Sequence, residues 1–312
     1  MTNAARADMK VGFACNNRCV FCAQGQKRAD CGALSFEELL ERLRSVAAPG
    51  RGLVLTGGEP TVRKDLPRLV AAARVLGFFP IQIQTNGRML SYDRVIDALL
   101  AAGATEFSPS LHAATAECHD ALTRAPGSFR DSVAGIRNLS RRGLDVVTNS
   151  VITRTNASGL PELVGLLASL GVRRAQLAFV HPVGTAFELF DSVVPRLFDI
   201  VEPIARAHEV ALARGVQLVT EAVPLCFLRG REYLAVESRI PHTTVVDLDG
   251  AAADYSAWRT GEGKSHGPSC VGCARRGECE GPWREYPDVF GWEEFVPFDA
   301  DGPTSDEEGR AL

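Results

Sequence analysis

The sequence lacks the features that mark a membrane protein, a secreted protein or a broad nucleic-acid binder. No apolar run approaches about 18 residues, so no membrane span is expected. Residues 1–10 contain no apolar stretch of the kind that a signal peptide needs. The net charge is −4 at pH 7, without the positive excess that nucleic-acid binding requires. Nine cysteines without a signal peptide indicate reduced thiols and metal ligands in a cytoplasmic protein.

What the chain does contain is typical of an ordinary globular protein. Hydrophobic residues make up 46% of the 312 positions and charged residues 23%. A chain of this length can bury a large core in one barrel-sized domain and still carry an appendage.

Three cysteines near the start, Cys15, Cys19 and Cys22, have the spacing C-x3-C-x2-C. Three thiolates on one short loop can hold three irons of a [4Fe–4S] cluster and leave the fourth iron open for chemistry. A structural zinc site would need a fourth ligand, and the next cysteine, Cys31, lies nine residues further on. A disulfide framework fits poorly because three is an odd number. The spacing therefore predicts an open-iron cluster, with Cys31 either structural or a nearby hydrogen donor.

A second motif follows about 35 residues after the cysteines, where residues 53–60 read L-V-L-T-G-G-E-P. Four strand-like residues there lead into Gly57, Gly58, Glu59 and Pro60. Alone, this turn chemistry would be a weak signal. Together with the cysteine loop it resembles the radical S-adenosylmethionine (radical SAM) superfamily, over roughly residues 10–300. In that family the second motif follows the second strand and grips the amino group of SAM.

The resemblance implies roles for the residues of this second motif. Gly57 and Gly58 have no side chains, so the backbone could approach SAM closely. Glu59 is expected to accept a hydrogen bond from the SAM ammonium group or from a neighbouring backbone donor.

Other SAM contacts are expected from residues at or just beyond the ends of later strands. Thr85 and Asn86 are placed to bond the ribose or the methionine part. Ser110 and Asn149 could do the same, although Ser and Asn often bond only to their local turns. Many family members place a basic residue near the fifth strand to meet the SAM carboxylate, and Arg154 is the nearest candidate here.

The alternation of strand and helix patterns predicts an α/β fold. Six strands are expected, at residues 11–14, 53–56, 81–85, 105–110, 145–151 and 175–180. Strand followed by helix, repeated six times, implies a parallel sheet with helices outside. The expected architecture is a partial TIM barrel, (β/α)6, with the site at the carboxyl ends of the strands. A doubly wound open sheet is the competing architecture, and the family resemblance favours the barrel.

Composition also suggests how the chain is divided. Residues 1–9 are expected to form an N-terminal tail and residues 10–222 the partial barrel. The cysteine-rich residues 223–298 would form a small extension, and the polar residues 299–312 a disordered tail. Pro203 is expected to kink or split a long helix before the extension.

Four later cysteines, Cys226, Cys270, Cys273 and Cys279, could coordinate a second [4Fe–4S] cluster or a zinc ion. Following the resemblance, they are similar to the twitch or SPASM extension of radical SAM enzymes, which carries auxiliary clusters. Cys226 lies in an apolar stretch and is the least certain ligand. If it is not a ligand, it could donate a hydrogen atom to a substrate radical, or the auxiliary cluster could keep an open iron. Cys118 is expected to be structural.

The resemblance also implies the reaction. With SAM and two [4Fe–4S] clusters, the enzyme would reductively cleave SAM to a 5′-deoxyadenosyl radical and abstract hydrogen from a substrate carbon. Modification of a ribosomally made peptide by crosslinking, epimerisation or oxidation is the leading interpretation. Oxidation or rearrangement of a small metabolite or cofactor precursor is the alternative. A non-catalytic zinc or iron–sulfur protein is a distant third.

Partners follow from the same reasoning. A reductant such as flavodoxin or ferredoxin is expected as a partner. Binding to nucleic acid or to a membrane is not expected. His112 and His181 end two of the expected strands, where they could move protons, bind substrate or simply pack in the wall.

Overall fold

The computed structural model describes residues 5–25, 27, 34–144, 146–248 and 252–299. Its strands are β1 (Arg6–Lys10), β2 (Gly52–Thr56), β3 (Ile81–Thr85), β4 (Glu106–Pro109), β5 (Val147–Ile152), β6 (Arg174–Phe179), β7 (Gln217–Glu221), β8 (Thr243–Val246) and β9 (Ala252–Asp254). Its α-helices are α2 (Phe36–Val46), α3 (Leu66–Val75), α4 (Asp93–Ala102), α5 (Ala116–Thr123), α6 (Ser128–Arg141), α7 (Leu160–Ser169), α8 (Thr185–Glu188), α9 (Phe190–Val193), α10 (Leu197–Arg214), α11 (Tyr255–Trp258) and α12 (Glu285–Phe290). Cys31 and residues 300–312 lie outside the described residues.

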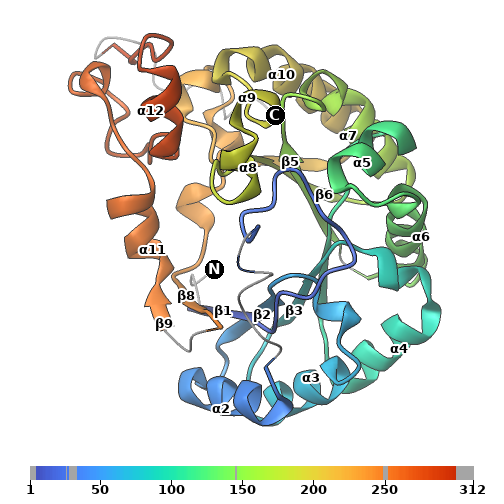
Figure 1. Cartoon of the computed structure of the whole chain (residues 1–312). Helices are drawn as coiled ribbons and strands as arrows, with labels where there is room; N and C mark the ends of the chain where they lie inside the picture. The colour runs from blue at the N-terminus through green and yellow to red at the C-terminus, as the bar shows by residue number, and fades with distance from the viewer. Residues whose placement is uncertain (1–4, 26, 28–33, 145, 249–251, 300–312) are drawn as a thin grey trace.

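The strands form a curved, mainly parallel sheet with its helices on the outside (Figure 1). One part has the order β4-β3-β2-β1-β8-β9, with only β9 antiparallel, and the other has the order β5-β6-β7. Single parallel bridges, Phe107 to Val146 and Ser110 to Asn149, join β4 to β5. From β1 to β7 the strands therefore follow one another in sequence order, whereas a doubly wound sheet reverses its order at a switch point. The expected partial barrel is confirmed.

The first strand differs from the sequence-based prediction. It is Arg6–Lys10, not residues 11–14, so part of the expected N-terminal tail belongs to the barrel. Ala7 and Met9 are fully buried, while Arg6 and Asp8 lie on the other face and form a salt bridge. These charged side chains hide the strand in the sequence, because an apolar run is a stronger signal than a short charged alternation. Val11, which begins the expected strand, instead leads into the cysteine loop.

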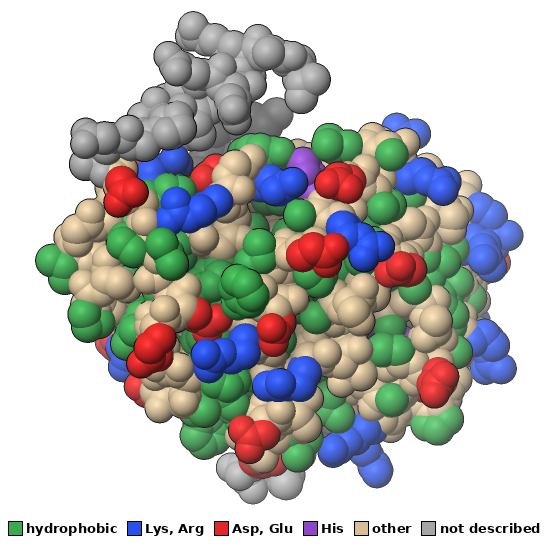
Figure 2. All heavy atoms as spheres, turned by 90° about the horizontal axis from the view of Figure 1, so that it is seen from above, with side chains coloured by type: hydrophobic (Ala, Val, Ile, Leu, Met, Phe, Trp, Pro, Cys, Tyr) green, Lys and Arg blue, Asp and Glu red, His purple; other side chains and the backbone are tan. Residues whose placement is uncertain are grey.

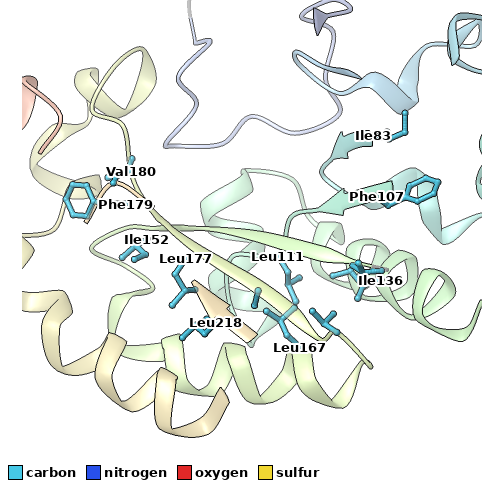
Figure 3. Close-up of a cluster of buried hydrophobic side chains, with 14 of the residues drawn as sticks. Ile83, Phe107, Leu111, Ile136, Ile152, Leu167, Leu177, Phe179, Val180 and Leu218 are labelled. Carbon is cyan, nitrogen blue, oxygen red and sulfur yellow. The ribbon is translucent and has the colours of Figure 1, made fainter. Parts of the chain in front are cut away.

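The apolar side chains of β5, β6 and β7 pack outward against helices. Ile152, Leu177 and Leu218 are at most 5% exposed and gather near Leu167 of α7 (Figure 3). Burying one such side chain stabilises a fold by about 1.5–3 kcal/mol. This packing fixes the strands whose carboxyl ends carry the polar residues described below.

Helix α10 contains Pro203 but is not split by it. The helix runs unbroken over 18 residues, so of the expected kink or split, the split does not occur. Ile200, Ile204 and Ala207 are buried along one face. Their packing outweighs the one backbone hydrogen bond that a proline removes from a helix.

The segment after residue 222 contributes to the barrel sheet. Strand β8 pairs in parallel with β1, with Arg6 opposite Thr243. At the carboxyl ends of the two strands, Nζ of Lys10, the last residue of β1, lies 2.6 Å from Oδ2 of Asp247, which follows β8. The domain boundary near residue 222 remains a prediction. Helices α11 and α12 follow on the same side of the molecule (Figure 1).

The molecular surface carries charges of both signs. In Figure 2, Lys and Arg side chains alternate with Asp and Glu across the visible face. In the part of the chain that the structure describes, no helix is long and apolar enough to cross a membrane.

Candidate functional site

The loop with Cys15, Cys19 and Cys22 leaves the carboxyl end of β1 and lies over the barrel opening (Figure 1). Its backbone is fixed from two sides. Arg18 N and Val20 N donate to the carbonyls of Thr123 and Leu122 near the end of α5, at 2.8 and 2.9 Å. The carbonyl of Cys22 accepts from Thr185 N at 3.0 Å. The three thiols are half-buried and form no disulfide. Such a donor set, on one anchored loop, fits an iron–sulfur cluster.

Gly57 and Gly58 make room for this loop. Gly58 N donates to Gly12 O and Glu59 N to Ala14 O, both at 2.8 Å. A Cβ atom at Gly58 would lie 2.5 Å from Ala14 O, closer than any side chain tolerates. The backbone at Gly57 and Gly58 was expected to approach SAM closely. In this structure it closely approaches residues 12–14, which lead to Cys15.

Glu59 accepts hydrogen bonds from neighbouring backbone donors, which is the second of the two roles expected for it. Its side chain is 2% exposed and accepts hydrogen bonds from Thr61 N at 3.0 Å, Thr85 Oγ1 at 2.6 Å and Asn86 N at 2.6 Å, and from the Thr61 hydroxyl. Burial raises the pKa of Glu59, although all these donors oppose the shift. Glu59 therefore joins the end of β2 to the end of β3.

Asn86 connects this junction to the cysteine loop. Its Nδ2 donates to Asn16 Oδ1 at 2.6 Å and lies 3.9 Å from Cys15 Sγ. Arg88 adds two contacts, to Asn16 O and, at 3.1 Å, to Asn17 Oδ1. Arg88 was not among the residues predicted from the sequence. Its signal was a basic residue three positions after Thr85, the polar last residue of β3.

Ser110 and Asn149 lie opposite each other in the bridge that joins β4 to β5. Ser110 N donates to Thr85 O at 2.9 Å, which places this pair beside the Thr85–Asn86 turn. Asn149 Oδ1 is buried without a hydrogen-bond partner among the described residues. Arg154 is exposed, and its guanidinium donates to Val194 O at 2.9 Å. Its expected contact with the SAM carboxylate stays a prediction.

The two histidines have different surroundings. His112 is 5% exposed, its Nδ1 accepts from Val151 N at 3.2 Å, and its backbone N–H donates to His119 Nδ1 at 3.1 Å. Burial, with His119 beside it, holds the pKa of His112 well below its usual range, so this ring is a neutral part of the wall. His181 stacks on Trp283 with ring centroids 3.8 Å apart.

The four later cysteines converge, although Cys226 is 44 residues from the nearest of the others in sequence. Cys226, Cys270, Cys273 and Cys279 line one narrow cavity. Phe298 N lies 3.4 Å from Cys273 Sγ, and Gly281 N lies 3.4 Å from Cys279 Sγ. Burial and the neighbouring thiols raise the pKa of Cys226 to about 12. Four thiols together in one mainly buried space fit a thiolate-bound metal group, whose positive charge would offset their ionisation.

A second cavity, of about 200 Å³, lies between the cysteine loop and the strand ends. Phe21 and Ala23, the neighbours of Cys22, form one wall. Glu221, Tyr255 and Trp283 belong to the same lining. A molecule in this cavity would lie beside the cysteine loop and under the carboxyl ends of the strands, where barrel enzymes place their substrates.

A family model described as the radical SAM superfamily matches residues 9–167. The chain belongs to the radical SAM superfamily. It is therefore an enzyme of a class that depends on SAM and a [4Fe–4S] cluster and carries out radical chemistry.

Two curated radical SAM relatives illustrate its place in the family. The chain is 30% identical over 230 residues to an AdoMet-dependent heme synthase of Methanosarcina barkeri, covering 73% of this chain and 64% of the relative. It is 32% identical over 180 residues to a probable GTP 3′,8-cyclase of Metallosphaera sedula, covering 56% of each. The chain thus spans less than two thirds of the length of these relatives.

Solved radical SAM structures share the fold over nearly the whole chain. Streptococcus suis SuiB bound to S-adenosylmethionine has a TM-score of 0.64 and 15% identity, covering 96% of this chain and 76% of SuiB. The enzyme anSMEcpe with bound AdoMet has a TM-score of 0.67 and 14% identity, covering 94% of this chain and 92% of anSMEcpe. At these identities the likeness extends to the fold alone.

Proposed function

We propose that Cys15, Cys19 and Cys22 hold the SAM-binding cluster and that the enzyme abstracts hydrogen from a substrate carbon in the cavity beside Cys22. The observation that carries this proposal is the wall formed by Phe21 and Ala23, since it places the cavity against the neighbours of Cys22. When bound, the cluster and SAM supply a 5′-deoxyadenosyl radical by reductive cleavage. A reductant such as flavodoxin or ferredoxin would supply the electron.

The surrounding residues would position these cofactors. Gly58 and Glu59 fix the backbone that leads to Cys15, and Asn86 and Arg88 hold the segment after it. Further SAM contacts are proposed for residues on the same rim: Gly57, Thr85, Asn86, Ser110, Asn149 and Arg154. Asn149 Oδ1 supports this assignment, because a buried acceptor without a protein partner is available to a ligand.

A second [4Fe–4S] cluster is proposed for Cys226, Cys270, Cys273 and Cys279, in an extension of twitch or SPASM type at residues 223–298. The common cavity of the four thiols supports Cys226 as a ligand rather than as a hydrogen donor. A four-cysteine zinc site has the same ligands, and metal analysis distinguishes the two.

For the substrate, modification of a ribosomally made peptide is the first candidate. It is supported by the fold shared with SuiB, which has been solved bound to its precursor peptide SuiA. A small metabolite or cofactor precursor is the second candidate, and the sequence relatives favour it, since they are named heme synthase and GTP 3′,8-cyclase.

Anaerobic reconstitution tests the whole proposal. Two clusters predict about eight irons per chain, and SAM with a strong reductant should give 5′-deoxyadenosine. Changing Cys15, Cys19 or Cys22 to Ala should abolish this cleavage, whereas Cys118→Ala, on α5, should not. Zinc in both sites without SAM cleavage would instead indicate a non-catalytic metal protein. Candidate peptides and metabolites, incubated in deuterated solvent and analysed by mass spectrometry, would then identify the substrate class.

A further inference from the structure

The cavity beside Cys22 has an acidic side chain in a largely aromatic lining. Glu221 ends β7, directly opposite Ala178 of β6 in the parallel register, and both residues line the cavity. The side chain is half-buried because it faces this space, and Gln176 Nε2 donates to its Oε2. His181, Tyr255 and Trp283 provide ring surface in the same lining.

Glu221 belongs to a group of buried and half-buried charges, which we call the interior charge cluster. The cluster comprises Arg6, Asp8, Glu221, Glu237, Arg259, Lys264 and Glu280. Burial and the charge of Glu237 raise the pKa of Glu221, while the charges of Lys264, Arg259 and Arg6 act to lower it. Salt bridges add Asp8, through Arg6, and Glu280, through Arg259. The cluster has four acidic and three basic members. Each basic member is already paired with an acidic one. Arg6 forms a salt bridge with Asp8, Arg259 lies 2.8 Å from Glu280, and Lys264 lies 3.7 Å from Glu237.

Of the seven members, Glu221 alone lines the cavity in the part of the chain that the structure describes. The acidic excess of the cluster is therefore presented to the cavity at this carboxylate. A cation placed there would balance the cluster, and aromatic rings favour cations over anions at short range.

A second, independent feature of the lining points to a bound molecule. Trp283 is 4% exposed, and its Nε1–H has no hydrogen-bond partner among the described residues. A buried donor of this kind is costly unless a ligand or water accepts from it. The cavity therefore offers a free donor at Trp283 and a carboxylate at Glu221.

We propose that this cavity binds a substrate through an organic cation, a protonated amine or guanidinium, held by Glu221 among the rings of His181, Tyr255 and Trp283. An acceptor oxygen on the same molecule receives the Trp283 hydrogen bond. A Lys or Arg side chain of a peptide has this chemistry, and so does a small amine that carries a carbonyl or hydroxyl group. The inference rests on the proposed function and specifies the substrate class of its site.

Binding to the reconstituted holoenzyme with SAM and without reductant tests this, since no turnover then occurs. Calorimetry would compare two pairs of probes that differ in charge but hardly in shape. The small-molecule pair is n-butylguanidinium and n-butylurea. The peptide pair is acetylated, amidated Ala-Arg-Ala and the same peptide with citrulline.

At least one cation should bind roughly tenfold or more tightly than its neutral partner, as a desolvated cation among rings would. Glu221→Gln should abolish this preference. Glu37→Gln, at an exposed position on α2 outside the cluster, should keep it. If only the peptide pair shows the preference for the cation, the substrate is a peptide. If only n-butylguanidinium and n-butylurea show it, the substrate is a small molecule.

Equal binding of both partners in each pair, no binding of any probe, or a preference that survives Glu221→Gln would overturn the inference. Its failure is distinguishable from failure of the proposed function. If only the inference fails, iron content and SAM cleavage remain intact. If the proposed function fails, iron and SAM cleavage are absent, whether or not any probe binds.

Discussion

Glu59 Oε2 accepts a hydrogen bond from the backbone N–H of Asn86 at 2.6 Å, and this bond joins the ends of two neighbouring strands. Asn86 in turn contacts the cysteine loop through Asn16. One buried carboxylate thus links the motif at 57–60 to the position of Cys15, without any contact to a cofactor being needed.

Replacing Glu59 by Gln should destabilise the protein by about 1–3 kcal/mol, because an amide NH₂ would face one of the donors that the carboxylate now accepts. Urea unfolding of wild type and variant measures the change. Glu37→Gln, at an exposed position in the first turn of α2, is the control and should have no measurable effect. Equal stability of the Glu59 variant would show that these hydrogen bonds do not hold the strand ends.

Arg88→Met should loosen the cysteine loop, because it removes the donors to Asn16 O and Asn17 Oδ1. Bonds from a charged donor are worth about 1.5–3 kcal/mol each, so a loss of roughly tenfold or more in SAM cleavage is expected. Iron content and 5′-deoxyadenosine formation are the measurements.

Arg130→Met provides the matched control for Arg88. Both arginines pair with Asp131, but the Arg130 side chain is 84% exposed and the Arg88 side chain 19%. The control should retain wild-type cleavage. A similar loss in both variants would attribute the effect to Asp131 rather than to the cysteine loop.

Cys226→Ala should lower iron by about four atoms per chain, since a cubane cluster rarely survives the loss of one of four ligands. The cluster at Cys15, Cys19 and Cys22 should remain and still cleave SAM. Iron analysis and electron paramagnetic resonance would follow both clusters, with Cys118→Ala as the control. Full iron content in the Cys226 variant would contradict its assignment as a ligand.

Asp247 should make stability depend on pH. Burial acts to raise the pKa of Asp247, but hydrogen bonds from Lys10, Leu248 N and Lys27 outweigh it and lower the value from 3.8 to about 2. Because the folded-state pKa is depressed, its stabilisation is fully present above about pH 4 and is lost as the pH falls toward 2. Allowing for solvent screening, about 1–2 kcal/mol is expected.

Chemical unfolding of the metal-free protein between pH 6 and 2 tests this prediction. Asp247→Asn should be less stable than wild type at pH 6, and the difference should shrink toward pH 2. Asp191→Asn, exposed on α9, is the control. A difference that stays constant with pH would mean that Asp247 acts through packing rather than charge.

Much of the fold and of the site was predictable because its signals are local. Five of the six expected strands are observed at nearly the expected residues, since apolar runs between turn residues are read from adjacent positions. The first strand was misplaced because Arg6 and Asp8 face the barrel interior, where they pair with each other. A charged, inward-facing strand is recognised only when its neighbours β2 and β8 are known.

The sequence by itself determined the cysteine triad, the motif at 57–60 and the family, because each depends on spacing along the chain. Only the tertiary structure decided which neighbours the polar groups have. It brought Cys226 to Cys270, Cys273 and Cys279, directed Glu59 to Asn86, and placed Glu221 in the cavity lining. These relationships join residues far apart in sequence, and the strand order and curvature of the barrel bring them together.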